Sequence, residues 1–372
     1  MPLILSEEQV MLRDAANGFL NDNAPIKHLR SLRDNRDADG LSRDLWRSFG
    51  EMGFAGVIID EVHGGSGLGP VEAGVIAEGL GRTLTPSPFL SSAILSASIL
   101  QDAGNDDQKF WLSKIAAGEA ILSLAIDEGA KHAPHRITTR AVASGNGFKL
   151  NGAKAMVLDG HIADALIVVA QTDDGLGLFL VDPTTSGITI ERTIMVDAHN
   201  AARIHFNDVT LEADALIGTA GQIKPVLNRA LSLGRACTAA SLNGAADQAF
   251  VTTLDYLKAR QQFGKLIGEF QALQHRAAHL YTELELTKAA TLAALHALES
   301  GKEGADLAAS IAKAKAGRVA ELAVQEGVQM HGGVGMTDEF DIGLFMKRVR
   351  VLNETLGDSS YHLNLLAEAR GY

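Results

Sequence analysis

The sequence has little of what several kinds of site require. Cysteine occurs once in 372 residues, at Cys237, which excludes an internal disulfide and any metal site built from cysteines. Nothing in the chain therefore needs an oxidising compartment. Positive charge is scarce, because 33 lysines and arginines stand against 45 acidic residues, a net charge of −12. A nucleic-acid partner needs a basic face to displace counterions from phosphates, so we expect no nucleic-acid binding.

Long apolar runs are also missing. The longest, between Pro88 and Gln101, is short and interrupted by serines, so we expect no membrane-spanning segment. The stretch from Met1 to Glu8 has no basic residues and too short an apolar run for a secretory signal, and we expect a cytoplasmic protein. What is present, 46% hydrophobic and 21% charged residues, is ordinary for a globular protein, and the length favours more than one hydrophobic core.

Residues 1–120 are predicted to form an N-terminal helical domain. Ser6 followed three residues later by Gln9 is a capping box at the start of a helix. The glycine-rich stretch from His63 to Pro70 lacks the spacing of a dinucleotide-binding loop and no βαβ unit surrounds it, so we interpret it as a connection between helices. The helices that it joins are expected at Arg43–Met52 and Pro70–Leu80.

In residues 121–218 the hydrophobic residues no longer follow a helical period, and this segment is predicted to form a middle antiparallel β-barrel domain. Short β-rich runs alternate with the dipeptides Asn146-Gly147, Asn151-Gly152 and Asp174-Gly175, which suit tight hairpin turns. Many short strands at this spacing are typical of a barrel or a sandwich. The expected strands are Ile121–Ile126, Ile137–Ala143, Phe148–Leu150, Ala165–Ala170, Leu176–Val181, Ile188–Ile190 and Ile204–Leu211.

Residues 219–372 are predicted to form a C-terminal four-helix bundle. Between Leu273 and Leu298 the apolar residues recur at steps of three and four, which places one apolar stripe along a long helix. Gly301 and Gly304 mark a break before the next helix, roughly Ala305–Met330. Long helices with short connections fit a bundle. The sequence therefore predicts an α+β multidomain protein with helices, a β unit and a helical bundle in that order.

Two segments of the predicted bundle could bind a nucleotide. Arg260, Gln262 and Phe263 place a forked cation and an amide beside an aromatic ring, which suits a pyrophosphate next to an adenosine. Gly332 and Gly333 would let the backbone approach a ligand closely. Each segment also has a purely structural interpretation. Arg260 could be a surface charge, Phe263 a ring in the core, and Gly332-Gly333 the C-cap of a helix.

Together these segments resemble the acyl-CoA dehydrogenase family. The motif Arg-x-Gln-Phe-Gly from Arg260 is followed by Phe270-Gln271, and Gln329 precedes His331-Gly332-Gly333. The resemblance covers the whole chain, including Asp44–Phe54 in the first domain and Phe206–Val209 at the end of the β domain. Within the family the sequence is most similar to the small subunits of two-component enzymes, such as the pimeloyl-CoA dehydrogenase small subunit, on the strength of Leu356–His362.

The resemblance implies the family's fold and chemistry. It implies FAD held at a subunit interface, α,β-desaturation of an acyl-CoA, and electron-transfer flavoprotein as the acceptor. It also implies either a homodimer or homotetramer, or a heterotetramer with a homologous subunit that bears the catalytic base. The residues that it assigns to the ADP part of a neighbouring subunit's flavin are Arg260, Gln262, Phe263, Gln271, Gln329, Gly332 and Gly333.

The catalytic half of the family's pattern is altered. The position of the family's base, a glutamate, falls on Leu356, and its alternative position falls on Gly234, neither of which can accept a proton. The Trp and Thr that pack against the flavin ring are replaced by Met156 and Leu158. The usual Thr-Glu-Pro segment is degenerate and reads Ile126-Asp127-Glu128.

Two acids near Leu356 are candidates for a relocated base, Asp358 and Glu354. Capping of the last helix is the stronger interpretation of Asp358, and a solvated charge is the stronger interpretation of Glu354. Three functions are therefore considered. The first is an auxiliary subunit without its own base, and the second is a self-sufficient dehydrogenase with a relocated base. The third is a non-catalytic protein that binds acyl-CoA, flavin or DNA, although the acidic net charge disfavours DNA.

Overall fold

The computed structural model describes residues 3–372 and contains two compact units. The helical unit comprises residues up to 31, 70–85 and 235–372, and the sheet unit comprises residues 32–69 and 86–234. The predicted domain limits at residues 120 and 218 do not coincide with these units and stay a prediction. No helix within residues 3–372 is long and apolar enough to cross a bilayer.

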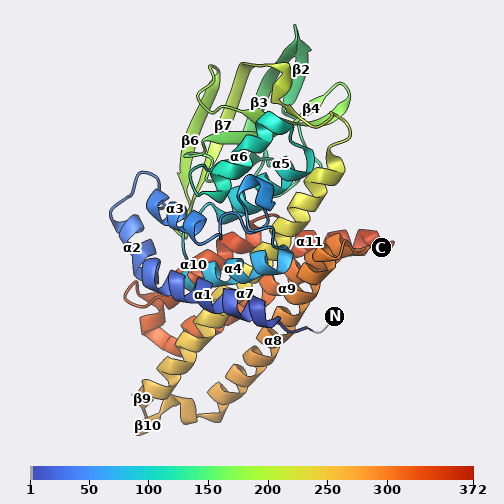
Figure 1. Cartoon of the computed structure of the whole chain (residues 1–372). Helices are drawn as coiled ribbons and strands as arrows, with labels where there is room; N and C mark the ends of the chain where they lie inside the picture. The colour runs from blue at the N-terminus through green and yellow to red at the C-terminus, as the bar shows by residue number, and fades with distance from the viewer. Residues whose placement is uncertain (1–2) are drawn as a thin grey trace. The chain divides into compact units, whose positions relative to one another are not determined.

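The helical unit is built from long helices that lie side by side (Figure 1). The stripe predicted from the sequence is confirmed, since Leu280, Leu284, Thr287, Thr291 and Leu295 of α8 are buried. The capping box at Ser6 is also confirmed, because its hydroxyl accepts from the Gln9 N–H. The helices are α1 (Glu7–Asn23), most of α2 (Ile26–Asp34), α4 (Pro70–Thr83), most of α7 (Lys224–Ala259), α8 (Gln271–Glu299), α9 (Ala305–His331), α10 (Ile342–Glu354) and α11 (Ser359–Ala369).

Glycine allows α4 and α7 to approach closely. A Cβ built at Gly244 would lie 1.9 Å from the carbonyl oxygen of Glu78, and one built at Gly81 would lie 2.0 Å from that of Ser241. Neither helix could carry a larger residue at these positions without moving. The Ser241 hydroxyl also donates to the Ala77 carbonyl at 2.9 Å. These contacts hold α4 against α7.

The sheet unit contains one mixed sheet of eight strands in the order β6-β7-β3-β2-β4-β5-β8, with β1 beside β4. Its core is a cluster of buried aliphatic and aromatic side chains from β1, β2, β3, β4, β5 and β7, including Leu150, Leu166, Phe179 and Ile204, and partly buried residues of β6 and β8 pack against it. The strands are β1 (Leu122–Ala125), β2 (Arg140–Ser144), β3 (Gly147–Leu158), β4 (Ala165–Thr172), β5 (Gly175–Val181), β6 (Ile188–Ile194), β7 (Asn200–Leu211) and β8 (Leu216–Ile217).

Two features of the predicted sheet are wrong. The sheet is not purely antiparallel, because β1 runs parallel to β4 and β2 meets β4 in parallel register at Arg140 and Gln171. Asn151-Gly152 is not a turn but lies inside β3, where the register with β7 shifts. Gly152 has φ 144°, and a Cβ there would lie 2.6 Å from the Thr139 hydroxyl, so this glycine marks a bulge. Closure of the sheet into a barrel stays a prediction.

The two other turn dipeptides are confirmed within one residue. Ser144 pairs with Gly147 and Thr172 pairs with Gly175, so the two-residue turns are Gly145-Asn146 and Asp173-Asp174. Both connections give the short hairpins that these residue types favour.

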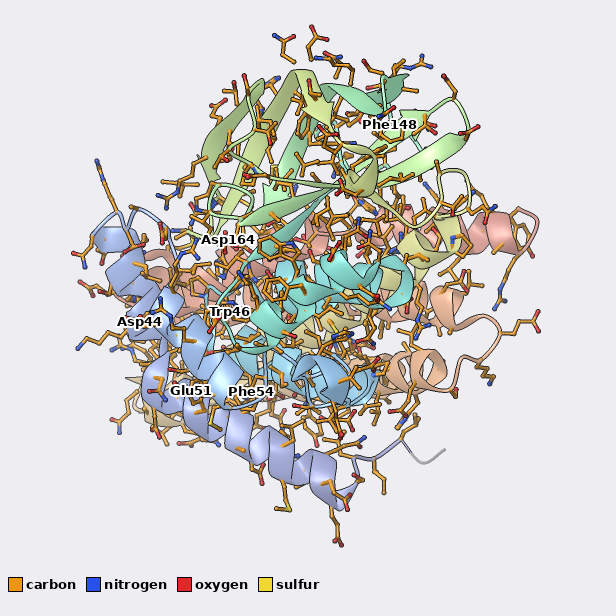
Figure 2. The ribbon with its side chains drawn as sticks, turned by 45° about the horizontal axis from the view of Figure 1, so that its top comes forward. Asp44, Trp46, Glu51, Phe54, Phe148 and Asp164 are labelled. Carbon is orange, nitrogen blue, oxygen red and sulfur yellow. The ribbon has the colours of Figure 1, made fainter. Side chains whose placement is uncertain are left out.

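The sheet unit contains an aromatic cluster on α3 and directly after it. The Trp46 indole of α3 (Arg43–Glu51) donates to the Ala120 carbonyl at 3.0 Å, and the Phe49 ring lies between those of Trp46 and Phe54, whose residues Figure 2 labels. Short helices complete the unit: η1 (Glu61–His63), the π-helix η2 (Phe89–Ser96), α5 (Ala97–Ala103), α6 (Asp106–Ala116) and η3 (Ala213–Ala215).

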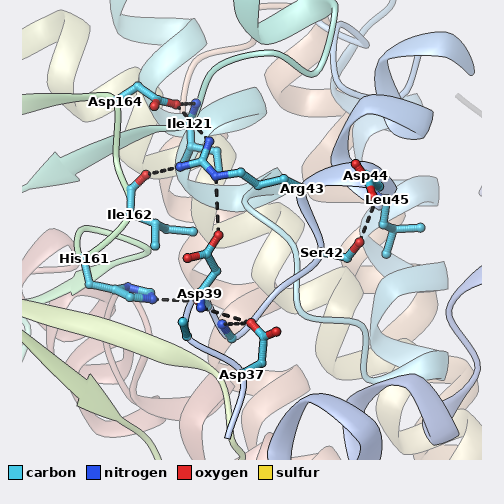
Figure 3. Close-up of polar contacts among 12 residues, drawn as sticks. Asp37, Asp39, Ser42, Arg43, Asp44, Leu45, Ile121, His161, Ile162 and Asp164 are labelled. Carbon is cyan, nitrogen blue, oxygen red and sulfur yellow. Dashed lines mark hydrogen bonds and ion pairs between the residues drawn. The ribbon is translucent and has the colours of Figure 1, made fainter. Parts of the chain in front are cut away.

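A polar network holds the start of α3 to the loop after β3 (Figure 3). The Arg43 guanidinium donates to the Ile162 carbonyl at 2.8 Å and pairs with Asp39 and Asp164. His161 Nε2 lies 2.7 Å from the Asp39 carbonyl, and burial lowers the pKa of this imidazole. The neutral ring therefore donates to that carbonyl at neutral pH.

Candidate functional site

The first predicted nucleotide motif forms a hairpin between α7 and α8 (Figure 1). Arg260 follows α7 directly, and β9 (Gln261–Gln262) pairs with β10 (Lys265–Leu266). The two turn residues, Phe263 with φ 53° and Gly264 with φ 79°, both lie in the left-handed region. Two such residues in succession are the pattern of a type I′ hairpin. Gly264 adopts this conformation freely, whereas it is strained for Phe263.

The hairpin leaves its polar and aromatic groups exposed. The Arg260 guanidinium makes no hydrogen bond or ion pair within residues 3–372, and the Gln262 amide contacts only its neighbour's carbonyl at 2.9 Å. Phe263 is 90% exposed, although its ring meets that of Phe270 edge-on at 6.2 Å. Gln271, the first residue of α8, is exposed as well. These groups are available to a ligand rather than used in folding.

The second predicted motif lies where α9 ends. Gln329 is exposed on the last turn, and the short helix η5 (Gly332–Met336) begins directly after His331. Gly332 has φ 65° and ψ −143°, a conformation open essentially only to glycine. A Cβ at Gly332 or Gly333 would meet no atom within 4 Å. The pair is therefore open to solvent, and only Gly332 is required by its own backbone.

A ring stack connects the two motifs. The Tyr256 carbonyl accepts the Arg260 N–H at 2.9 Å, and the Tyr256 ring stacks on that of His331 with centroids 4.4 Å apart. The Phe340 ring closes the group, 5.9 Å from Tyr256 and 5.7 Å from His331. His331 directly precedes Gly332, so the stack holds both motifs at one end of the helical unit. The sequence interpretation did not include Tyr256, one helical turn before Arg260.

His331 works as a packing residue here. Its Nδ1 lies 2.7 Å from the Gly327 carbonyl, and the ring is 3% exposed. Burial lowers the pKa of His331, so the ring is neutral and Nδ1 carries the proton that is donated to Gly327. His331 is therefore a structural hydrogen-bonding group.

At the position that the sequence resemblance assigns to the base, the structure has a buried leucine. Leu356 is 7% exposed and adopts φ 56° in the connection between α10 and α11. The Asp358 carboxylate accepts the Tyr361 N–H at 2.8 Å and caps α11, as predicted. Glu354 pairs with Arg350 at 3.0 Å, four residues earlier on α10. Gly234, the alternative position, lies within α7.

The altered segments of the sheet unit surround a buried ion pair. Lys154 is 1% exposed and donates to Glu128 at 2.7 Å and to the Ile126 carbonyl at 3.1 Å. Burial alone would raise the pKa of Glu128, but hydrogen bonds from Lys154, Thr138 and Thr139 hold it at about 2. Two residues after Lys154, Met156 has φ 53° and is 46% exposed at a second register shift of β3. The degenerate segment is thus well ordered, but Met156 and Leu158 offer no side-chain donor.

The donor set fits one half of a flavin dinucleotide. An exposed guanidinium, three exposed amides and an open pair of glycines suit a pyrophosphate and its adenosine. Within residues 3–372, no group of His, Cys, Asp and Glu side chains is arranged to hold a metal ion.

Three family models match nearly the whole chain. Their descriptions are "Acyl-CoA dehydrogenase, N-terminal domain" for residues 6–119, "Acyl-CoA dehydrogenase, middle domain" for residues 127–209 and "Acyl-CoA dehydrogenase, C-terminal domain" for residues 225–370. These matches follow the predicted order of helical, β and helical segments.

Individual relatives agree with the family models. The long-chain specific acyl-CoA dehydrogenase from pig mitochondria is 30% identical over 352 residues, which cover 91% of this chain and 81% of the relative. FadE12, an acyl-CoA dehydrogenase of Mycobacterium tuberculosis, is 29% identical and the match covers 98% of this chain and 96% of the relative. The crystal structure of an acyl-CoA dehydrogenase from Geobacillus kaustophilus superposes with a TM-score of 0.90 at 28% identity, covering 99% of both chains.

Proposed function

The chain belongs to the acyl-CoA dehydrogenase family, and we propose that it serves there as an FAD-holding subunit that lacks its own catalytic base. In this proposal the protein takes part in the α,β-desaturation of an acyl-CoA thioester. It is of the small-subunit type, similar to the pimeloyl-CoA dehydrogenase small subunit, and pairs with a homologous, base-bearing chain in a heterotetramer. Its electrons pass to an electron-transfer flavoprotein.

Retention of FAD is supported by the exposed donors at the end of the helical unit. Arg260 and Gln262 would hold the pyrophosphate, Phe263 would pack on the adenosine, and the backbone at Gly332 and Gly333 would approach the phosphates without a side chain between them. Gln271 and Gln329 add amide donors on either side. When bound, FAD supplies a hydride acceptor for the β-carbon of the acyl chain.

The observation that carries the auxiliary role is the buried leucine at position 356. Removal of the α-proton needs a base in a dry pocket, where desolvation raises its pKa toward neutrality. Leu356 cannot take the proton, and the two nearby acids are engaged, Asp358 as the cap of α11 and Glu354 with Arg350. A partner chain is therefore the source of the base.

Reconstitution with FAD tests this proposal. The chain alone should retain FAD but not desaturate acyl-CoA thioesters of short, medium or long chain at enzymatic rates, and a base-bearing homologue should co-purify with it. Turnover by the isolated chain would contradict the auxiliary role. If neither the single chain nor the complex retained FAD, the proposal as a whole would be contradicted.

The alternative, a relocated base at Asp358, is separated by a matched pair of variants. Asp358→Asn keeps an N-cap oxygen and removes the base, whereas Asp358→Ala removes both and should cost about 1 kcal/mol of stability. If the auxiliary role is correct, Asp358→Asn leaves the activity of the complex unchanged. Loss of activity in Asp358→Asn with an unchanged melting temperature would favour the relocated base.

A further inference from the structure

Lys313 is a buried lysine that the proposed chemistry does not use. It lies on α9 and is 0% exposed. Its Nζ donates to two backbone carbonyls, that of Asn353 in the last turn of α10 and that of Gly357 in the α10–α11 connection, both at 3.0 Å. No salt bridge accompanies these bonds among the described residues, so the contact is between an amine and the backbone.

The end of α10 explains why an amine is required. The last carbonyls of a helix have no partner within it, and Asn353 is the penultimate residue of α10. A donor is therefore needed, and a cation is favoured by the negative end of the helix dipole. The charged groups that act on Lys313 are Asp358, Glu354 and Arg235, and burial outweighs the two carboxylates, lowering its pKa to about 7. Charged or neutral, the amine retains enough N–H groups for both carbonyls.

The same face of α9 is shaped to receive the connection. A Cβ at Gly317 would lie 2.3 Å from the Asn353 amide oxygen and 2.7 Å from the Ser359 hydroxyl, so a larger residue would displace these two side chains. The Ser359 hydroxyl donates to the Ala314 carbonyl at 3.2 Å. Between these contacts stands Leu356, held at φ 56°, which costs a non-glycine residue about 1 kcal/mol or more.

We infer that Lys313 is the positioning residue for position 356, holding the Asn353–Gly357 segment against α9 so that residue 356 keeps its left-handed conformation. The two carbonyls that it binds lie on either side of Leu356, which fixes both ends of the strained turn. The functional meaning of this inference rests on the proposed function, because position 356 matters to chemistry only in this family's active site.

Hydrogen exchange of the chain without ligands tests the positioning itself. The reporters are the amides of Thr355 and Gly357, which donate to Val351 at 3.0 Å and to Glu354 at 3.2 Å. Lys313→Met should speed their exchange by about tenfold, since two hydrogen bonds are lost, and leave α8 and the start of α9 unchanged. The control is Lys315→Met, which removes another lysine of α9, one that is paired with Glu283 of α8. This variant should not affect the reporters. Should Lys313→Met not fold, Lys313→Gln, which keeps a shorter donor, is used.

Unchanged reporters, or acceleration spread evenly over the helical unit, would overturn the inference. A second readout separates it from the proposed function. Leu356→Glu places a carboxylate at the position, and flavin reduction by acyl-CoA in this protein should slow about tenfold when Lys313→Met is added, with FAD affinity unchanged. If Leu356→Glu shows no flavin reduction while the exchange result holds, the proposed function fails and the positioning role stands.

Discussion

At the residue scale, exposed donors at Arg260 and Gln262 contrast with a buried leucine at position 356. The Arg260 guanidinium has no hydrogen-bond or ion-pair partner within residues 3–372. The backbone of Arg260 is nevertheless fixed by hydrogen bonds with Tyr256 and Ile267. A guanidinium held in place without a partner is suited to an anionic ligand. Leu356, by contrast, is buried and strained at a position that cannot do acid–base chemistry.

Replacement of Arg260 should therefore weaken FAD binding and little else. Arg260→Ala removes a charge-assisted contact to the pyrophosphate, and the dissociation constant for FAD should rise by about 10-fold or more. The melting temperature of the chain without FAD should not change, because the side chain is exposed. Titration followed by flavin fluorescence measures the effect, with Arg370→Ala, an exposed arginine at the end of α11, as control. Equal affinities in the two variants would contradict the assignment.

Lys313 gives the chain a specific pH dependence. The pKa of Lys313 falls from 10.5 to about 7 on folding, so between these values the unfolded chain binds a proton that the folded chain does not. The contribution of Lys313 to stability is least favourable below about pH 7 and improves as pH rises toward 10. Relative to Lys313→Met, the wild-type chain should gain free energy of unfolding from pH 7 to pH 9.5, as measured by urea titration. A difference that does not vary with pH would show that the amine is charged in the folded state.

Single residues were predictable where their role is local. The cap at Asp358 and the box at Ser6 follow from neighbours three residues away, and both are confirmed. Lys313 was not predictable, because its partners are 40 and 44 residues distant and are backbone atoms, which have no sequence signature. The catalytic and cofactor roles of the site residues stay predictions until ligand binding is measured.

At the scale of elements, periodicity and turn residues predicted most helices and strands but not how the strands pair. The buried stripe of α8 and the hairpins after β2 and β4 follow from local pattern. The parallel pairing of β1 with β4 joins residues about 40 positions apart, and Gly152 has the same dipeptide signal in a bulge as in a turn. Local sequence cannot distinguish these cases.

Helix contact through glycine yields a prediction for α4 and α7. Gly244→Ala places a methyl group 1.9 Å from the Glu78 carbonyl, so the helices must separate, and the chain should lose about 1–3 kcal/mol. Gly18→Ala is the matched control, because a Cβ there meets nothing within 4 Å on α1, and it should stabilise by about 0.5–1 kcal/mol. Thermal denaturation of both variants measures the difference, and equal melting temperatures would contradict the close approach.

At the scale of the whole molecule, the family's order of helical, β and helical segments is confirmed by three matching domain models. The two nucleotide motifs, about 70 residues apart in sequence, are joined by the stack of Tyr256 on His331. In the proposed function, a chain that keeps this end of the site while leucine fills the assigned base position holds a cofactor for another chain's chemistry. Whether a partner supplies the base is the central question for that proposal.

The most direct test is the reduction of bound flavin by acyl-CoA without oxygen, followed by the flavin's absorbance. The FAD-loaded wild-type chain, mixed with butyryl-, octanoyl- or palmitoyl-CoA, should keep its flavin oxidised, and Leu356→Glu should allow it to be reduced. Leu356→Gln, which matches the size without the base, should behave as the wild type. Rapid flavin reduction in the wild-type chain alone would show that it has its own base and would contradict the account.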